Sequence, residues 1–409
     1  MDDLISLFME YTDGTVSSPA IYRLWSGIAL VAGALERRVW SKTIYGVNFP
    51  NQFIFLMGKP AVGKNVIVKV ENLWRRVREL SRPNEEYLKL CPKSVNFASI
   101  VREFVKARKI YLPKSGQPYQ YHSLIAAAPE FGIFFPEYDT KILEKLNDIW
   151  GNPEFYSESR KTGPENERDV KITNPNFTLL AGLQPAVMAS RFGQEAWDSG
   201  FMRRVIFIFA DEGIRLDLLG EIRDTTKLEN KIIARLNSLG QQYGQFDWGR
   251  GALESLALWD RTGREPVPNH PRLNNYNESR LELVSRLCLV SAASAGETMI
   301  RVDDVERSIF WLTSAEVDMP GVFASMGGKG DDKILEDLWF FVRSSWQTDK
   351  RAVLVSEAVR FLLRRAPQDK IRGMLDAAVA GDYLKWSSPG KERLMWMDKS
   401  LWKKEEVNY

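Results

Sequence analysis

The sequence predicts an α/β fold built on a parallel sheet. Four short apolar runs, each long enough for one buried strand, are separated by stretches with helical spacing. A glycine-rich loop follows the first run, and a helix-patterned stretch follows the loop. Because parallel strands are buried on both faces, continuous apolar runs are typical of them. The runs are Phe53–Met57, Ser123–Ala128, Phe177–Leu183 and Val205–Phe209.

Helix-patterned segments flank the predicted sheet on both sides. Residues 1–45 carry apolar side chains at helical spacing, so we expect an N-terminal helical segment there. The sheet is expected within residues 46–215, where the polar, charged stretch Glu154–Thr173 predicts a surface loop or hairpin. Residues 216–326 are again mostly helical in pattern, and we expect them to form a helical lid or subdomain.

A second, smaller domain is predicted over residues 331–409, after a linker rich in glycine. Two helix-patterned stretches, Leu354–Arg364 and Lys370–Ala380, precede two strand-patterned stretches, Asp382–Trp386 and Arg393–Trp396. Helix, helix, strand, turn and strand is a winged-helix-like order. Such a domain can bind DNA or serve as a protein–protein module, and the sequence leaves both open.

Composition and charge exclude several classes of protein. The 409 residues are 44% hydrophobic and 27% charged, which is typical of a globular chain. The formal net charge of +3 is too small for a uniformly basic surface, so any contact with a polyanion must come from local patches. Cys91 and Cys288, with His122 and His270, are too few for a disulfide framework or for the usual zinc sites.

The cytoplasm is the expected location. The first residues are acidic, whereas a secretory signal peptide begins with basic residues. No apolar run reaches the roughly 18 residues of a membrane-spanning helix. We therefore expect no membrane association.

The most specific chemical pattern is Gly58, four further residues, and then Gly63 and Lys64. Glycines let a loop curl so that several backbone N–H groups point at a phosphate, and the following helix places its positive end there. Lys64 would reach the β- and γ-phosphates. We therefore predict an ATP-binding loop, with a structural glycine-rich turn as the alternative. The expected nucleotide contacts are Gly58, Lys59, Pro60, Ala61, Val62, Gly63, Lys64, Asn65 and Val66.

Two positions expected to bind Mg²⁺ depart from the usual phosphate-loop pattern. Asn65 replaces the serine or threonine whose hydroxyl binds Mg²⁺, and its amide oxygen can take that place. Glu130 follows the second predicted strand, where an Asp-Glu pair is usual, but Pro129 stands in place of the aspartate. Glu130 would position or deprotonate the attacking water and bind the metal. The alternative is a surface glutamate that ends the strand.

Taken in order, these segments resemble the AAA+-like P-loop ATPases of phage and plasmid replication modules, which are primase-associated helicase proteins close in layout to superfamily III helicases. The resemblance covers residues 20–215 well and residues 276–318 loosely. It implies an AAA+/RecA-like P-loop sheet, and the host cytoplasm as the location if a phage encodes the chain. Besides the phosphate loop, it is carried by Leu24–Gly27, Arg37–Trp40, Phe49–Asn51, Ala127–Gly132, Asn174–Phe177, Gly182–Pro185 and Gly200–Val205.

The resemblance implies roles for polar residues outside the phosphate loop. Gln184, at the end of the third predicted strand, is similar to the sensor residue that contacts the γ-phosphate or its attacking water; a polar strand cap is the alternative. Arg204 is similar to an arginine finger that reaches the nucleotide of a neighbouring subunit, with Arg203 beside it as the other candidate. Lys64 and Glu130 complete the expected catalytic set. An arginine finger implies an oligomer, expected to be a homo-oligomeric ring such as a hexamer.

The resemblance also implies a DNA contact. Superfamily III helicases place a channel-lining hairpin between the second and third strands. In this chain, Arg160 and Lys161 would grip phosphates there, with Lys171 behind them. A solvated loop with scattered charges is the alternative. The expected partner is single-stranded or forked DNA, and a separate primase or polymerase would carry out priming.

The sequence thus predicts an ATP-dependent, oligomeric DNA helicase or translocase. The alternative is an AAA+-like switch, such as a helicase loader, an initiator or a DNA-bound assembly factor, that binds ATP and hydrolyses it slowly. Asn65 and the missing aspartate favour this alternative. A small-molecule kinase is disfavoured, because nothing in the chain resembles an acceptor-site base.

Overall fold

The computed structural model of the chain describes residues 2–80, 87–113, 116–134, 140–159, 169–191, 200–268, 270–326, 331–364, 366–380, 383–387, 390 and 392–396. The chain divides into two compact units, Met1–Ser325 and Met326–Tyr409. The finer boundaries predicted at residues 45 and 215 stay predictions.

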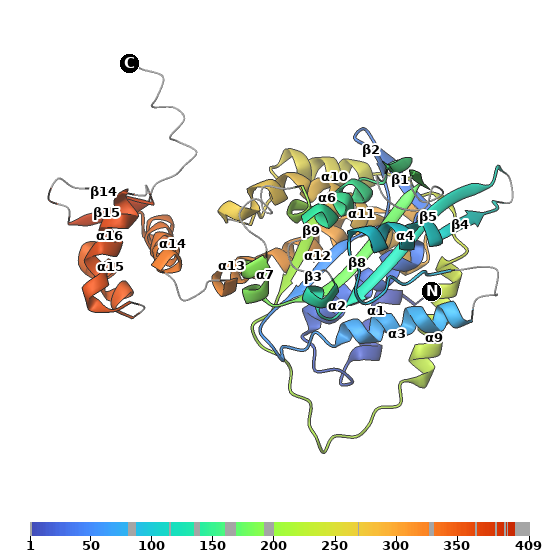
Figure 1. The fold of residues 1–409 in the computed structure, drawn as a ribbon, viewed down its shortest axis with the longest axis horizontal. Helices are drawn as coiled ribbons and strands as arrows, with labels where there is room; N and C mark the ends of the chain where they lie inside the picture. Colours follow the sequence, from blue (N-terminus) through green and yellow to red (C-terminus); the bar gives the residue numbers. More distant parts are fainter. Residues whose placement is uncertain are drawn as a thin grey trace. The chain divides into compact units, whose positions relative to one another are not determined.

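The first unit is built on a sheet that, in the described residues, has five strands and is mostly parallel (Figure 1). In sheet order, the strands are β4 (Arg108–Tyr111), β5 (Tyr119–Ala128), β8 (Pro175–Leu183), β3 (Phe53–Met57) and β9 (Val205–Phe209). The last four are parallel, and β4 pairs antiparallel with β5. The predicted α/β class with a parallel sheet is confirmed. β4 was not predicted, because two of its four residues are basic and it lacks an apolar run.

Helices surround this sheet and account for most of the remaining structure of the first unit. They are α1 (Leu4–Thr12), α2 (Ala20–Leu35), α3 (Val66–Glu79), α4 (Phe97–Lys106), α5 (Phe131–Phe134), α6 (Thr140–Trp150), α7 (Pro185–Arg191), α9 (Thr226–Leu239), α10 (Ala252–Arg261), α11 (Asn274–Ala295), α12 (Val302–Asp318) and α13 (Pro320–Met326). Short 3₁₀ turns are η2 (Met202–Arg204) and η3 (Pro271–Leu273).

Both faces of the central sheet are covered. On one face α2 and α3 pack together, and the indole N–H of Trp74 in α3 donates to the Leu30 carbonyl of α2 (3.2 Å). Gly33 permits this approach, because a Cβ atom there would lie 2.5 Å from the Trp74 ring. On the other face, Phe131 of α5 packs against Phe55 of β3, with ring centroids 4.7 Å apart. The sheet is therefore fully enclosed at its centre, as the continuous apolar runs predict.

The predicted N-terminal helical segment, residues 1–45, extends too far at its carboxyl end. Helix α2 ends at Leu35, and Glu36 has a φ of 54°, which breaks the helix. The chain then forms strand β1 (Val39–Thr43), whose β-branched ends favour an extended backbone.

Smaller sheets lie around the central one. Strand β1 pairs with β2 and β10, β11 pairs with β12, and β6 pairs with β7. The stretch between β5 and β8 thus contains a β-hairpin. Of the surface loop or hairpin predicted for Glu154–Thr173, the hairpin is confirmed. The bounds are β2 (Gly46–Asn48), β6 (Phe155–Ser159), β7 (Asp169–Thr173), β10 (Gly244–Gln245), β11 (Asp247–Trp248) and β12 (Met299–Ile300).

A buried arginine fastens α11 to the amino end of the sheet. Arg286 is 2% exposed, and its guanidinium donates to Asn51 Oδ1 (2.5 Å), just before β3. It also donates to the Trp150 carbonyl (2.9 Å) and Asn152 Oδ1 (3.2 Å) after α6, and to Glu282 (2.8 Å). The group lies 3.6 Å from the centre of the Trp150 ring. One side chain therefore joins three segments that are distant in sequence.

We expect Arg286→Met to lower the free energy of unfolding by about 3–5 kcal/mol, because the buried acceptors lose their donor. Arg78→Met, on the exposed side of α3, should change it by less than about 0.5 kcal/mol. Urea unfolding followed by circular dichroism measures both. Equal, small effects would show that the Arg286 contacts do not hold the unit together.

The second unit combines helices with a small antiparallel sheet. Strand β13 pairs with β15, and β15 pairs with β14. Its elements are α14 (Asp331–Asp349), β13 (Val353–Leu354), α15 (Val355–Leu363), the 3₁₀ turn η4 (Gln368–Lys370), α16 (Ile371–Ala380), β14 (Leu384–Trp386) and β15 (Arg393–Trp396). The two predicted helices and two predicted strands are confirmed, whereas α14 and β13 were not predicted.

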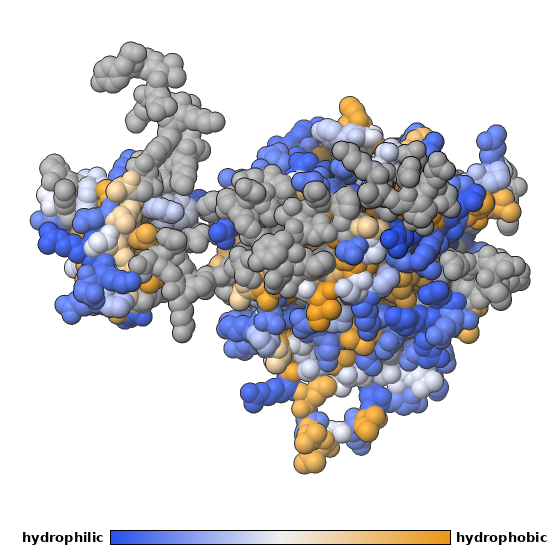
Figure 2. Space-filling model, viewed as in Figure 1, coloured by the Kyte–Doolittle hydropathy of each residue, from blue (hydrophilic) through white to orange (hydrophobic). Residues whose placement is uncertain are grey.

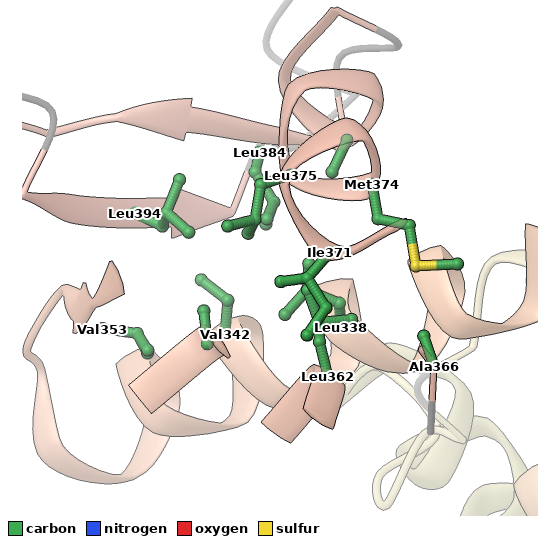
Figure 3. Packing of buried hydrophobic residues seen from close by; sticks show 12 residues of the cluster. Leu338, Val342, Val353, Leu362, Ala366, Ile371, Met374, Leu375, Leu384 and Leu394 are labelled. Atoms are coloured by element: carbon green, nitrogen blue, oxygen red, sulfur yellow. The ribbon is translucent and has the colours of Figure 1, made fainter. Parts of the chain in front are cut away.

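The second unit has its own hydrophobic core (Figure 3). Side chains from α14, α15, α16 and the three strands point toward one another there. Leu338 and Val342 of α14 are among its most buried members, at 0% and 1% exposed, so this helix belongs to the domain. The core residues shown are Leu338, Val342, Val353, Ala358, Leu362, Ala366, Ile371, Met374, Leu375, Ala378, Leu384 and Leu394.

Candidate nucleotide-binding site

The glycine-rich loop, Gly58–Asn65, leaves the carboxyl end of the central strand β3. The Gly58 N–H donates to the Leu183 carbonyl at the end of β8 (3.3 Å). On the other side, Ala210 comes just after β9, and its N–H donates to the Met57 carbonyl (3.1 Å). The loop is thus fixed between two parallel neighbours at the edge of the sheet where α/β proteins usually bind ligands.

Both glycines of the pattern are required by close contacts. A Cβ atom on Gly58 would lie 2.6 Å from the Ala210 carbonyl oxygen and 2.7 Å from the Tyr22 hydroxyl. Gly63 has a φ of +96°, and a Cβ atom there would lie 1.8 Å from the Ser17 carbonyl oxygen. The loop is therefore packed under the N-terminal segment on one side and the chain after β9 on the other.

The loop presents backbone donors that suit an anion. Among the described residues, the N–H groups of Lys59 and of residues 61–65 have no acceptor; Pro60 has no N–H. Helix α3 begins at Val66 and has no acidic residue in its first turn, so no acid of that turn neutralises its positive end. Unpaired N–H groups at a helix start form a phosphate-binding arrangement.

Lys64 folds back over its own loop. Its ammonium donates to the carbonyls of Gly58 (2.8 Å) and Lys59 (3.0 Å). Partial burial lowers the pKa of Lys64, and the nearby negative charge of Glu130 acts in the opposite direction. The structure therefore brings the predicted phosphate-binding lysine and the predicted catalytic glutamate within electrostatic reach of each other.

Glu130 stands at the carboxyl end of β5, after Pro129, and its side chain is exposed. Its carbonyl accepts from the N–H of Ile133 (3.0 Å) and so begins α5. A Cβ atom on Gly182 would lie 2.2 Å from the Pro129 carbonyl oxygen, so β8 passes very close here. Pro129 supplies no side-chain oxygen, which leaves Glu130 as the acid at this position.

Gln184 follows β8 at the same edge of the sheet. The pairing of Leu183 with Met57 makes Gln184 the neighbour of Gly58. Its carbonyl accepts from the Met188 N–H (3.0 Å) at the start of α7, and its side chain is partly exposed. The sequence-predicted polar residues of the nucleotide site thus meet at the carboxyl ends of β3, β5 and β8.

The donors available to Mg²⁺ are sparse. Among the described residues, no group of three or more His, Cys, Asp or Glu side chains could hold a metal ion. Nucleotide-bound Mg²⁺ usually takes one or two protein oxygens, together with phosphate oxygens and water. Asn65 and Glu130 fit such a set, because both side chains are exposed and both carry oxygen donors.

Sequence reasoning missed the residues that brace the loop. The Ser18 hydroxyl donates to the Gly63 carbonyl, and it lies 2.9 Å from Asn65 Oδ1. The Tyr22 hydroxyl donates to the Met57 carbonyl. Asp211 pairs with Lys59 (2.7 Å), although both side chains are more than half exposed, so this pair contributes little. No local pattern marks these residues.

The two candidate finger arginines lie at the opposite, amino-terminal end of β9. Arg204 is tied down: it donates to the Gly200 carbonyl (2.7 Å) and to Asn147, and lies 5.1 Å from the Trp150 ring centre. Burial and the charge of Arg203 lower the pKa of Arg204 to about 10. Arg203 is partly exposed and makes no hydrogen bond or ion pair with a described residue. Arg203 is therefore the better placed of the two to reach another molecule.

The predicted DNA-binding residues lie on or beside the β6–β7 hairpin. Lys171 is exposed on β7, with its ammonium 4.3 Å from the centre of the Phe155 ring. Glu158 pairs with Lys145, which neutralises one acid of the hairpin. Arg160 and Lys161 come directly after β6 and lie outside the described residues.

Comparison of the sequence with protein-family models gives no match, and a search of curated proteins finds no relative. Within the described residues, none of the helices combines the length and the apolar character needed to cross a membrane. What the site can do must therefore be inferred from its geometry.

Gly63→Ala should abolish ATP binding and lower the free energy of unfolding by about 3 kcal/mol, because it adds a clash with Ser17 to an unfavourable positive φ. Gly14→Ala is the matched control: its φ is also positive (+64°), but no atom lies within 4 Å of the added Cβ. It should cost about 1 kcal/mol and leave ATP binding unchanged. Fluorescence titration with an ATP analogue and urea unfolding measure both; intact binding in Gly63→Ala would contradict the close-packed loop.

Proposed function

We propose that the first unit is an ATPase that binds ATP with Mg²⁺ on the Gly58–Asn65 loop. The observation that carries the proposal is the joint placement of unpaired backbone N–H groups, Lys64 and Glu130 at one end of the parallel sheet. Lys64 would exchange its contacts with two loop carbonyls for the β- and γ-phosphates. Mg²⁺, when bound, neutralises phosphate charge.

Hydrolysis requires a group that positions or deprotonates the attacking water. Glu130 is suited to this task because it is exposed and lies near Lys64. Gln184 adds a polar side chain at the end of β8, which lies next to the strand that carries the Gly58–Asn65 loop. With β8 between the strand that ends in Glu130 and the phosphate-loop strand, the arrangement supports an AAA+-like P-loop core.

We infer that the active form is an oligomer. Arg203 and the phosphate loop lie at opposite ends of β9 and β3, which are paired in register. At about 3.3 Å per residue they are roughly 20 Å apart, so Arg203 cannot reach the nucleotide of its own subunit. An arginine that pairs with no described residue suits, in this position, a contact with the nucleotide of a neighbouring subunit.

An exposed apolar loop also favours association. The segment 211–225, between β9 and α9, starts beside the phosphate loop and projects from the unit (Figure 1). Leu218, Leu219 and Ile222 are 96%, 92% and 100% exposed, and Figure 2 shows apolar side chains gathered on this loop. Contiguous exposed apolar residues are typical of interaction surfaces.

The function that we propose for the oligomer is DNA translocation or unwinding, as a member of the helicase-like class. The β6–β7 hairpin carries the exposed Lys171, and the pairing of Glu158 with Lys145 reduces its negative charge. Phosphate contacts need only positive charge and reach. The second unit contains, in chain order, a helix, a strand, two helices and two strands, and the order of strands in its sheet is β13-β15-β14. This arrangement is compatible with a winged-helix domain.

A second candidate is an ATP-binding switch that hydrolyses slowly. Asn65 and Pro129 occupy the two positions where a hydroxyl and a carboxylate usually bind Mg²⁺. Both replacements weaken the hold on the metal, and they favour this candidate specifically.

The ATPase rate in Mg²⁺ should rise several-fold on addition of single-stranded DNA, and Glu130→Gln should lower it by roughly 100-fold or more through loss of the general base. Glu254→Gln, at an exposed position of α10, is the control and should leave the rate unchanged. Steady-state phosphate release measures all three proteins. Tight ATP binding without turnover in the unmodified protein would favour the switch.

Arg203→Ala and Arg204→Ala should behave differently. Arg203→Ala is expected to leave ATP binding and stability unchanged but to lower the ATPase rate by roughly 1,000-fold, if Arg203 acts on a neighbouring nucleotide. Arg204→Ala should lower the free energy of unfolding by about 2–3 kcal/mol, since it removes hydrogen bonds and the contact with Trp150. Thermal unfolding and phosphate release distinguish the two; unchanged hydrolysis in Arg203→Ala would remove the finger assignment.

A further inference from the structure

The side chain of Asn65 does not do what asparagine usually does in its position. Asn65 is the N-cap residue of α3, where an asparagine side chain normally accepts a hydrogen bond from the first helical turn. Here the Asn65 backbone is already helical (φ −66°, ψ −14°) and its side chain caps nothing. The amide faces Ser18 instead, with Oδ1 2.9 Å from the serine hydroxyl.

The Ser18 hydroxyl is in contact with two hydrogen-bond acceptors but can donate to only one of them. It is fully buried, and its hydroxyl also bonds to the Gly63 carbonyl. A serine hydroxyl has a single proton, so it cannot donate fully to Gly63 and to Asn65 Oδ1 together. The Gly63 carbonyl is fixed by the close packing of Gly63 against Ser17, whereas the amide of the exposed Asn65 can turn by 180°.

We propose that Ser18 is a positioning residue that orients the Asn65 amide when magnesium–ATP binds; this inference depends on the proposed ATP binding. Ser18 gives its proton to Gly63 and then can only accept, so the NH₂ group of Asn65 becomes its donor. Oδ1 consequently faces away from Ser18, on the exposed side of Asn65, where it is available to Mg²⁺.

The need for such a device follows from the residue at position 65. The side chain of a serine or threonine there has one polar atom, the hydroxyl oxygen, and this atom binds the metal without having to be oriented by a neighbour. An asparagine amide has two polar ends of similar shape, of which only the oxygen binds a cation. Residues outside the first coordination shell that orient a ligand in this way typically change metal affinity by about 10–100-fold.

The test is a double-mutant cycle made of Ser18→Ala, Asn65→Thr and the combination. Isothermal titration calorimetry with a non-hydrolysable ATP analogue, in Mg²⁺ and in EDTA, gives the factor by which Mg²⁺ strengthens binding. We expect Ser18→Ala to lower this factor about 10-fold when residue 65 is asparagine. With threonine there, the effect should be below about 2-fold, because its hydroxyl needs no orientation.

The outcomes separate this inference from the proposed function. A similar loss in both backgrounds, or no loss in either, would overturn the positioning role. If the unmodified protein binds the ATP analogue equally well with and without Mg²⁺, the positioning role is overturned but the proposed ATP binding stands. If the analogue does not bind at all, both proposals are overturned. If Ser18→Ala does not fold, Ser18→Cys, whose thiol is a weak donor and acceptor, replaces it in the same cycle.

Discussion

The buried guanidinium group of Arg286 is the contact on which the arrangement of the first unit depends. It joins α11 to Asn51, just before β3, and to Asn152, after α6. Arg37 reinforces the same place by donating to the carbonyls of Asn152 (2.7 Å) and of Pro175 at the start of β8 (2.7 Å). A buried polar group is costly unless it is hydrogen-bonded, so these segments cannot separate without leaving buried donors and acceptors without partners.

The two ends of the sheet are therefore chemically different. At the amino ends of the strands, arginines use the local carbonyl and amide oxygens as internal acceptors. At the carboxyl ends, Gly58, Gly63 and Gly182 allow backbone segments to approach so closely that a side chain would clash. The first end is held together by these internal bonds and serves as the support. The second end keeps unpaired N–H groups and carries the candidate site.

The sequence predicted the central strands and the glycine-rich loop because these are local patterns. An apolar run, a glycine pair and a helix pattern lie within 30 residues of one another. The bonds from Ser18 to Asn65 and from Arg286 to Asn51 could not be predicted, because they join residues 47 and 235 positions apart. Helical spacing also extended the first helices too far, since it gave no weight to the break at Glu36. Gln184 and Glu130 were placed correctly at one edge because parallel strands end together.

The position of Lys64 has a consequence for the ATP binding that we propose. The ammonium already has two oxygen partners in its own loop, the carbonyls of Gly58 and Lys59. A phosphate bound there would replace two internal oxygen partners of this cation, and its release would let the ammonium return to them. Empty and loaded loops would then differ mainly in which oxygens that group holds.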